Sequence, residues 1–135
     1  MVIQTMVKNK VFICDDDIGI ASTLDLIFKM VDSETIIETD SSRAYDQIVS
    51  LRPEIVIVDL NMPVVSGKDL IRMIRKTPQL KKTFILCISA TDDGRDVALE
   101  AGANMILPKP FDMDDIIAIV ENVLKTKFPK NTVYE

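Results

Sequence analysis

The feature that most constrains the fold is an unbroken apolar run over residues 55–58, which ends on Asp59. A run without polar interruption is typical of a strand that is buried on both faces, as in a parallel sheet. Asn61 and Pro63 follow directly and indicate a turn. Asp59 is therefore predicted at the carboxyl end of a central strand, where open α/β sheets gather their ligands.

The rest of the chain alternates between short apolar runs and stretches with helical spacing. Further strands are predicted over residues 10–14, 35–39, 83–88 and 104–107. The helices that follow the strands are predicted on Ala21, Leu24, Phe28 and Val31; on Ala44, Ile48, Val49 and Leu51; on Leu70, Ile71, Met73 and Ile74; on Val97, Ala98 and Leu99; and on Ile116, Ile117, Val120, Val123 and Leu124. Five strand–helix units predict a doubly wound α/β fold, with a five-stranded parallel sheet and helices on both faces.

Polar residues and helix breakers set the expected helix ends. The expected caps are Ser41 or Ser42 for the second helix, Asp92 or Asp93 for the fourth, and Asp112 or Asp114 for the fifth. Pro53, Pro78 and Gly102 are expected to end the second, third and fourth helices. The domain is expected to span residues 9–127, between a loose segment over 1–8 and a tail over 128–135.

Composition limits where such a domain acts. The 135 residues suit one domain, and the net charge of −5 opposes non-specific binding to nucleic acid or to an anionic membrane. The N-terminus does not resemble a signal peptide, and no apolar run approaches the roughly 18 residues of a membrane span. We expect a cytoplasmic protein without membrane insertion and without direct contact to nucleic acid.

Cysteine and histidine usage narrows the chemistry further. Cys14 and Cys87 each lie near the end of an apolar run without a CxxC partner, so both are expected to be buried, reduced thiols. The chain contains no histidine, which excludes imidazole catalysis by its own side chains and removes the commonest transition-metal ligand.

Polar residues follow four of the predicted strands at the same end of the sheet. They are Asp15, Asp16 and Asp17 after the first strand, Asp59 after the third, Ser89 after the fourth and Lys109 after the fifth. Each alone is as readily explained as a helix cap or a solvated charge, but their convergence favours a functional site. Crowded carboxylates raise one another's pKa unless a cation neutralises them, and oxygen ligands suit Mg²⁺. Asp59 is then a candidate nucleophile toward a phosphoryl group.

These motifs, taken in order, resemble the receiver domain of two-component response regulators, the chemotaxis-regulator family. The resemblance rests on Asp15-Asp16, on Val58-Asp59-Leu60-Asn61-Met62-Pro63, on Ser89-Ala90 and on Lys109-Pro110-Phe111, and it covers residues 9–127. It implies a flavodoxin-like sheet with the strand order 2-1-3-4-5. It also implies a phospho-accepting signalling domain in a phosphorelay, which is no enzyme beyond its own phosphorylation and dephosphorylation.

The resemblance also assigns ligands for a metal ion and for a phosphoryl group. Asp59 is implied to accept the phosphoryl group from a phosphohistidine on a histidine kinase or a histidine phosphotransfer protein. Asp15, Asp16 and Asp59, with the backbone carbonyl of Asn61, are implied to bind Mg²⁺.

Two further residues are implied to contact the phosphoryl group. Ser89 is implied to hydrogen-bond a phosphoryl oxygen, and Lys109, with a cis peptide bond to Pro110, to pair with it. Phosphorylation is implied to switch a surface of the fourth helix, fifth strand and fifth helix, where a downstream target protein binds.

One position departs from the family pattern. Ile106 stands three residues before Lys109, where the family often has a Tyr or Phe that reorients on activation. A β-branched side chain is held largely in one rotamer. We therefore expect the loop over residues 89–93 to carry the activation change instead.

Three alternatives are weighed against this interpretation. A flavin-binding module on the same fold would place a phosphate beside Asp15, Asp16 and Asp17, which would repel it. A phosphatase of the haloacid dehalogenase type needs a second Asp where this chain has Asn61. A receiver domain cut from a longer regulator or a hybrid histidine kinase stays open, although Met1 and the short tail favour a stand-alone regulator.

Overall fold

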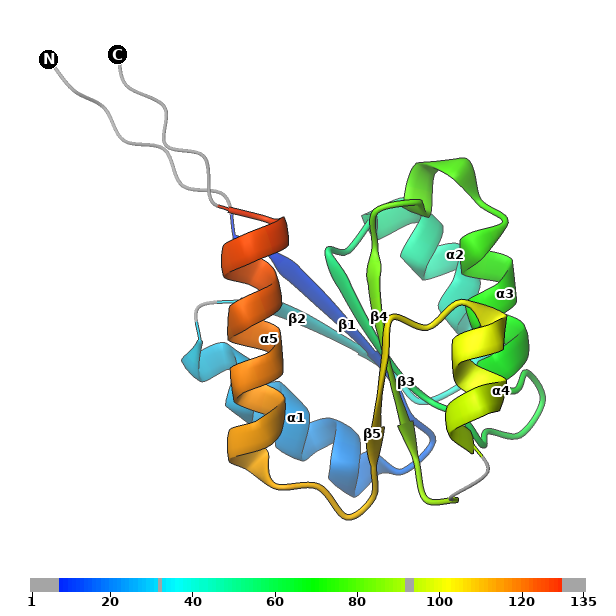
Figure 1. Ribbon diagram of the computed structural model, residues 1–135, viewed down its shortest axis with the longest axis horizontal. Coiled ribbons are helices and arrows are strands. Elements are labelled where there is room, and N and C mark those ends of the chain that lie inside the picture. Colours follow the sequence, from blue (N-terminus) through cyan, green and yellow to red (C-terminus); the bar gives the residue numbers. More distant parts are fainter. Residues whose placement is uncertain (1–7, 32, 92–93, 130–135) are drawn as a thin grey trace, which may run out of the picture.

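The computed structural model describes residues 8–31, 33–91 and 94–129 (Figure 1). The elements in chain order are β1 (Lys10–Cys14), α1 (Ile18–Met30), β2 (Glu34–Glu38), α2 (Ser41–Leu51), β3 (Ile55–Asp59), α3 (Gly67–Arg75), the 3₁₀ helix η1 (Pro78–Leu80), β4 (Phe84–Ser89), α4 (Gly94–Ala101), β5 (Met105–Pro108) and α5 (Met113–Lys127). The five α-helices follow the five strands in strict alternation, which confirms the predicted class.

The sheet is parallel throughout and has the order β2-β1-β3-β4-β5, as expected. β3 lies at its centre, with Ile57 opposite both Ile13 on β1 and Leu86 on β4. Every residue of β3 is buried. A strand that is paired on both edges and covered on both faces has to be apolar along its whole length, which explains the run that ends at Asp59.

Two helical layers cover the sheet. In Figure 1, α1 and α5 lie on one side of the sheet and α2, α3 and α4 on the other. Alternate residues of β3 serve the two layers, because Ile55 and Ile57 pack with the α1 and α5 residues, whereas Val56 and Val58 pack with those of α2, α3 and α4. The two cores hold the strands rigidly and so fix the positions of the side chains at the strand ends.

The start of α2 differs from the prediction. Asp40 is its N-cap, and the Asp40 carboxylate accepts a hydrogen bond from the backbone N–H of Ser42 at 3.0 Å. The hydrogen bonds from Ser42 also hold the pKa of Asp40 below its usual range. The predicted cap at Ser41 or Ser42 is therefore wrong. A carboxylate accepts more strongly than a hydroxyl, and it leaves the Ser41 hydroxyl free to bond elsewhere.

Other helix ends agree with the prediction only in part. Asp112 stands at the N-cap of α5, but its side chain makes no capping hydrogen bond. The alternatives Asp92 and Asp93 for α4 lie outside the described residues. Pro78 begins η1, a short helix that the sequence pattern did not predict, and η1 buries Leu80.

Strand bounds and helix faces show smaller differences. The second, fourth and fifth strands are each displaced by one residue or less from the predicted ranges. Met73, Val97 and Leu99 lie on exposed parts of their helices, with 39% of each residue accessible. The apolar spacing thus placed the helices correctly but overstated how many of their side chains enter the core.

The structure also tests two predictions that came from composition, the burial of the cysteines and the lack of a membrane-spanning helix among the described residues. Cys14 and Cys87 are both buried free thiols, as predicted, and burial raises the pKa of each to about 12. Across the described helices, of which α5 has 15 residues, none has the length and apolar character that a membrane crossing requires.

Candidate functional site

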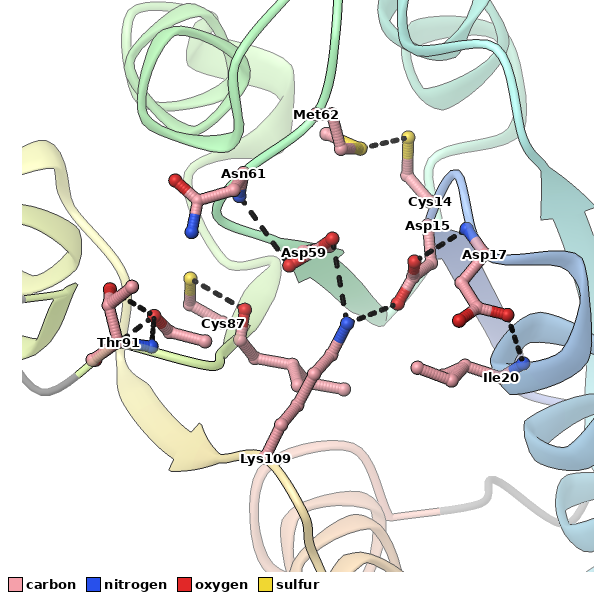
Figure 2. Close-up of polar contacts among 12 residues, drawn as sticks. Cys14, Asp15, Asp17, Ile20, Asp59, Asn61, Met62, Cys87, Thr91 and Lys109 are labelled. Carbon is pink, nitrogen blue, oxygen red and sulfur yellow. Dashed lines mark hydrogen bonds and ion pairs between the residues drawn. The ribbon is translucent and has the colours of Figure 1, made fainter.

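The candidate site lies at the carboxyl edge of the sheet, where four strands end (Figure 2). Asp15 follows β1, Asp59 is the last residue of β3, Ser89 is the last residue of β4, and Lys109 directly follows β5. Parallel pairing aligns these strand ends, so residues far apart in the sequence meet in one place.

Three carboxylates form the acidic part of the site. One oxygen from each of Asp15, Asp16 and Asp59 lies within 4.8 Å of the others. Asp15 and Asp59 are buried, with exposed fractions of 2% and 7%, whereas Asp16 is exposed. Access from solvent to this cluster is therefore through the side on which Asp16 lies.

Backbone groups fix the two buried carboxylates. The N–H of Asp17 donates to Oδ1 of Asp15 at 2.9 Å, and the N–H of Asn61 lies 3.5 Å from Oδ1 of Asp59. In each case the donor comes two residues after the carboxylate, in the turn that leaves the strand. The turns therefore hold one oxygen of each carboxylate and leave Oδ2 directed at the centre of the site.

Burial and mutual repulsion make these carboxylates hard to ionise. The pKa of Asp59 is raised to about 6, first by burial and then by the negative charge of Asp15, while Lys109 opposes the rise. The pKa of Asp15 is also raised, mainly by burial, with Lys109 and the N–H of Asp17 acting against it. Asp59 is thus ionised at neutral pH, but its charge is less well stabilised than that of an exposed carboxylate.

Lys109 supplies the cation that faces both buried carboxylates. Its Nζ lies 3.3 Å from Oδ2 of Asp15 and 3.5 Å from Oδ2 of Asp59 (Figure 2). The backbone N–H of Lys109 donates to the carbonyl of Ser89 at 2.8 Å, which ties the lysine to the end of β4. The Lys109-Pro110 peptide bond is cis, as expected.

Ser89 is buried at the same edge of the sheet, but its described hydrogen bonds are made with Thr91 and not with the carboxylates. Its hydroxyl is 3.1 Å from the Thr91 hydroxyl and 3.2 Å from the Thr91 carbonyl, and it accepts from the Thr91 N–H at 3.2 Å. Gly94 passes very close, since a Cβ there would lie 2.4 Å from the Ser89 hydroxyl oxygen. The first turn of α4 therefore packs directly against Ser89.

The donor set fits a divalent cation such as Mg²⁺. The three carboxylates offer hard oxygen ligands from two strand ends within one small volume. The raised pKa values of Asp15 and Asp59 are an electrostatic cost that a bound cation would relieve. The residues at this edge of the sheet therefore match the chemistry of a Mg²⁺ site.

Asp17 has a different role from its two neighbours. Its carboxylate caps α1 by accepting from the N–H groups of Gly19 at 2.9 Å and Ile20 at 3.2 Å. It therefore lies outside the acidic cluster, although the sequence pattern had grouped it with Asp15 and Asp16. The signal was present in the sequence, because a capping Asp directly precedes the first residues with helical spacing.

Sequence reasoning missed the contacts that support the loop after β3. Ser41 donates to the carbonyl of Pro63 at 2.6 Å and accepts from the N–H of Val65 at 3.0 Å. Gly67 begins α3 against this loop, and a Cβ there would lie 2.3 Å from the carbonyl oxygen of Asp59. Nothing in the local pattern relates Ser41 to a loop more than 20 residues away.

Curated proteins with similar sequences include transcriptional and DNA-binding regulators. "Transcriptional regulatory protein PrrA" of Mycobacterium tuberculosis is 27% identical over 118 residues, which are 87% of this chain and 51% of that protein. "DNA-binding response regulator MtrA" of Mycolicibacterium smegmatis is 29% identical over 120 residues, with 87% and 51% of the two chains covered. The chain spans about half the length of these relatives.

Solved structures with the same fold include response regulators from several bacteria. A putative response regulator from Chloroflexus aurantiacus is 28% identical, with a TM-score of 0.83 over 88% of this chain and 99% of that chain. Chemotaxis response regulator CheY4 of Vibrio cholerae is 26% identical, with a TM-score of 0.81 over 87% of this chain and 100% of that chain. The family model described as "Response regulator receiver domain" matches residues 11–121. With four strand ends meeting around Asp59 and this match over most of its length, the chain belongs to the family of response regulator receiver domains of two-component systems.

Proposed function

We propose that Asp59 accepts a phosphoryl group from a phosphohistidine on a histidine kinase or a histidine phosphotransfer protein. Asp15, Asp16, Asp59 and the backbone carbonyl of Asn61 would hold Mg²⁺. The observation that carries this proposal is the placement of the Lys109 ammonium 3.5 Å from Oδ2 of Asp59, beside a second buried carboxylate. A cation at that place stabilises the negative charge that develops on transferring phosphoryl oxygens.

The side chains divide the work of the transfer. The ionised Asp59 carboxylate attacks phosphorus, so that a P–O bond forms while the P–N bond of the donor breaks. The electrons of the P–N bond leave with the imidazole, which departs as a neutral ring because its other nitrogen already carries a proton. Because the pKa of Asp59 is about 6, most of the protein carries the reactive carboxylate at neutral pH. A bound Mg²⁺ supplies further charge neutralisation at the phosphoryl oxygens.

Phosphorylation changes the partners of two residues. The Lys109 ammonium, which faces Asp15 and Asp59, gains phosphoryl oxygens as stronger acceptors. Ser89 has to give up its hydrogen bonds with Thr91 before its hydroxyl can reach the phosphoryl group. The loop after β4 and the end of β5 are thus both biased by one covalent event, which is the requirement for a switch.

The output surface is proposed on α4, β5 and α5. Lys109 follows β5 directly and Thr91 precedes α4, so both contacts that change with phosphorylation lead into this surface. Met105 on β5 exposes a large apolar side chain there, with 39% of the residue accessible. An exposed apolar side chain of this size suits binding of a downstream target protein.

The cellular setting is proposed from composition. We place a receiver domain of residues 9–127, with the flanking segments 1–8 and 128–135, in the cytoplasm. The net charge of −5 supports a domain that does not itself bind nucleic acid.

This receiver domain can also be part of a longer regulator. The named relatives are transcriptional or DNA-binding regulators of about twice the matched length, so a receiver domain belonging to a longer regulator fits as well as a stand-alone protein. A phosphatase with an aspartate nucleophile is disfavoured, because Asn61 stands where a second Asp is needed. Absence of phosphomonoester turnover by the purified protein would separate the two classes.

The test is phosphorylation by a small phosphodonor in the presence of Mg²⁺. Intact-protein mass spectrometry is expected to show the mass of one added phosphoryl group, which base treatment removes as expected for an acyl phosphate. The Asp59→Asn variant should not be labelled, whereas Asp46→Asn, an exposed carboxylate on α2, should be labelled as the wild type is. Equal labelling of Asp59→Asn would contradict the assignment.

A further inference from the structure

A basic hollow lies at the end of the sheet opposite Asp59. It has a volume of about 520 Å³, and its charged lining consists of Arg75, Lys81, Lys82 and Lys127, with Phe84 and Phe128 as apolar neighbours. Phe84 starts β4, whereas Ile88, four residues later, is paired with Asp59. At about 3.3 Å per residue, the basic hollow is about 13 Å from the phosphorylation site along the strand.

The basic hollow is positively charged, whereas the chain as a whole is negatively charged. The net charge is −5, yet no acidic residue lines this hollow. Among the described residues, no carboxylate lies within ion-pair distance of Arg75, Lys81, Lys82 or Lys127. In the described part of the chain, four cations therefore share one concave surface without a carboxylate counterion.

Arg75 gives the strongest indication of a missing anion. Its guanidinium is half-buried and donates to the carbonyls of Gly102 at 2.8 Å and Thr83 at 2.9 Å, and to Oδ1 of Asn104 at 2.6 Å. All three acceptors are neutral, and burial lowers the pKa of Arg75. These bonds are made to neutral acceptors, so the positive charge of this half-buried group is left without an anionic partner among the described residues.

The lysines reach the hollow from separate segments. Lys81 and Lys82 are exposed in the turn between η1 and β4, and Lys127 is the last residue of α5. Nζ of Lys127 is 5.4 Å from the centroid of the Phe84 ring, which places the ammonium beside a residue that lines the hollow. Figure 1 shows this end of α5, in red, at the side of the molecule opposite the arrowhead of β4.

We propose that the basic hollow binds a small polyanion that carries several phosphate groups. Lysine ammonium groups and a guanidinium are the side chains that bind phosphate, and four of them match more than one phosphate group. The volume also exceeds what one inorganic phosphate occupies. A nucleic acid is a poorer fit, because a long polyanion would extend from this concave site over a chain whose net charge is −5.

The polyphosphate chain has two possible sources, a free inorganic polyphosphate or the phosphate chain of a nucleotide. The probes are tripolyphosphate and ATP, each titrated into the unphosphorylated protein without Mg²⁺, with binding followed by amide chemical shifts. We expect saturable shifts at Thr83, Phe84, Asn104 and Phe128, and none at Ser89 or Asn61. Tighter binding of ATP than of tripolyphosphate assigns the site to nucleotides, and equal or weaker binding of ATP assigns it to the free polyanion.

Matched variants test whether position or overall charge matters. Lys81→Ala and Lys82→Ala should each weaken tripolyphosphate binding about tenfold, as the loss of one charged hydrogen bond predicts. Lys125→Ala changes the net charge equally, lies on α5 outside the hollow, and should leave binding within about twofold. Lys125→Ala weakening binding as much as Lys81→Ala, or no saturation below about 1 mM probe, would overturn the proposal. Neither outcome bears on phosphorylation of Asp59, because no phosphodonor is present.

Discussion

Nζ of Lys109 lies 3.5 Å from Oδ2 of Asp59, although the strands that carry the two residues are not neighbours. β4 lies between β3 and β5, so the lysine side chain has to extend across the end of β4 to reach the carboxylate. The same ammonium is 3.3 Å from Oδ2 of Asp15 on the far side. One cation from the edge strand thus balances two carboxylates from the centre of the sheet.

Removing this cation should destabilise the protein in a pH-dependent manner. Lys109→Ala leaves Asp15 and Asp59 buried and facing each other, and should lower the free energy of unfolding by about 1 to 3 kcal/mol at neutral pH without Mg²⁺. The loss should shrink at about pH 4.5, below the pKa of about 6 of Asp59, because a protonated carboxyl does not need the ammonium. Urea unfolding at both pH values measures the difference.

Lys125→Ala is the control for this experiment. Lys125 is exposed in the last turn of α5, and its removal should change stability little at either pH. An equal loss for Lys109→Ala at neutral and acidic pH would show that the ion pairs are not its cause.

Asp59→Asn is expected to stabilise the Mg²⁺-free protein at neutral pH. The pKa of Asp59 is raised from 3.8 to about 6 in the folded state, so between these values the folded protein holds a proton that the unfolded chain has lost. Stability therefore falls as the pH rises through this window, and above about pH 6 the full cost is present. Two pKa units correspond to a cost of about 3 kcal/mol, which the neutral amide avoids.

Thermal melts of wild type and Asp59→Asn between about pH 4 and pH 7 check this sign. The wild type should lose stability over this range, and the variant should lose less. Added Mg²⁺ should raise the melting temperature of the wild type more than that of the variant. A variant that is less stable than the wild type at neutral pH would contradict the electrostatic interpretation.

The central strand and the residues at its end could be predicted, because they depend on local patterns. The apolar run before Asp59 requires burial on both faces, and the alternation of strands and helices requires parallel pairing. That brings Asp15 and Lys109 to the same edge whatever the loops do. The strand order itself came from the family resemblance, since local patterns do not determine which strands are neighbours.

What could not be predicted depends on tertiary contacts or on competition between neighbouring groups. Asp16 and Asp15 are adjacent and chemically identical, but only packing decides that Asp15 is 2% exposed while Asp16 faces solvent. Asp40 replaced Ser41 as the cap of α2 because Ser41 hydrogen-bonds Pro63, a contact over 22 residues. The basic hollow likewise joins the ends of α3, β4 and α5, which no local pattern relates.

Ser41→Ala should destabilise the protein through the loop after β3. The buried Ser41 hydroxyl donates to the carbonyl of Pro63 at 2.6 Å and accepts from the N–H of Val65 at 3.0 Å, and Ala leaves both groups without this partner. The expected loss is about 1 to 3 kcal/mol in chemical unfolding. Between these two positions Val64 has φ of 72°, a left-handed conformation that is costly for a β-branched residue. The two hydrogen bonds of Ser41 therefore also stabilise a strained backbone conformation.

Two further variants distinguish the loss of the two Ser41 hydrogen bonds from a general change in the stability of α2. Ser50→Ala, at an exposed position of the same helix, should be neutral or stabilising by up to about 0.5 kcal/mol because Ala has the higher helix propensity. Gly adopts a positive φ without the steric cost that Val has, so Val64→Gly should recover part of the stability that Ser41→Ala loses. If Ser41→Ala costs no more than Ser50→Ala, the hydroxyl does not hold the loop.

The last prediction concerns how phosphorylation reaches the output surface when Ile106 stands at the position where the family often has an aromatic residue. Ile106 is half-buried beside a hollow of about 160 Å³ that Ser89, Thr91, Arg95 and Pro108 also line. Its β-branched side chain is held largely in one rotamer. The Ser89 hydroxyl, by contrast, has to leave Thr91 to reach a phosphoryl group, and it makes its described hydrogen bonds only with that residue.

We expect the loop after β4 to move and Ile106 to stay. Structures with and without beryllofluoride and Mg²⁺ should show broken Ser89–Thr91 hydrogen bonds, a displaced Thr91 and an unchanged χ1 of Ile106. Ile106→Val should cost only about 0.5 to 1.5 kcal/mol in stability and leave the displacement of Thr91 intact, because the relay does not pass through this side chain. A rotamer change of Ile106 beside unbroken Ser89–Thr91 hydrogen bonds would show instead that the side chain of Ile106 carries the signal and that the loop after β4 does not.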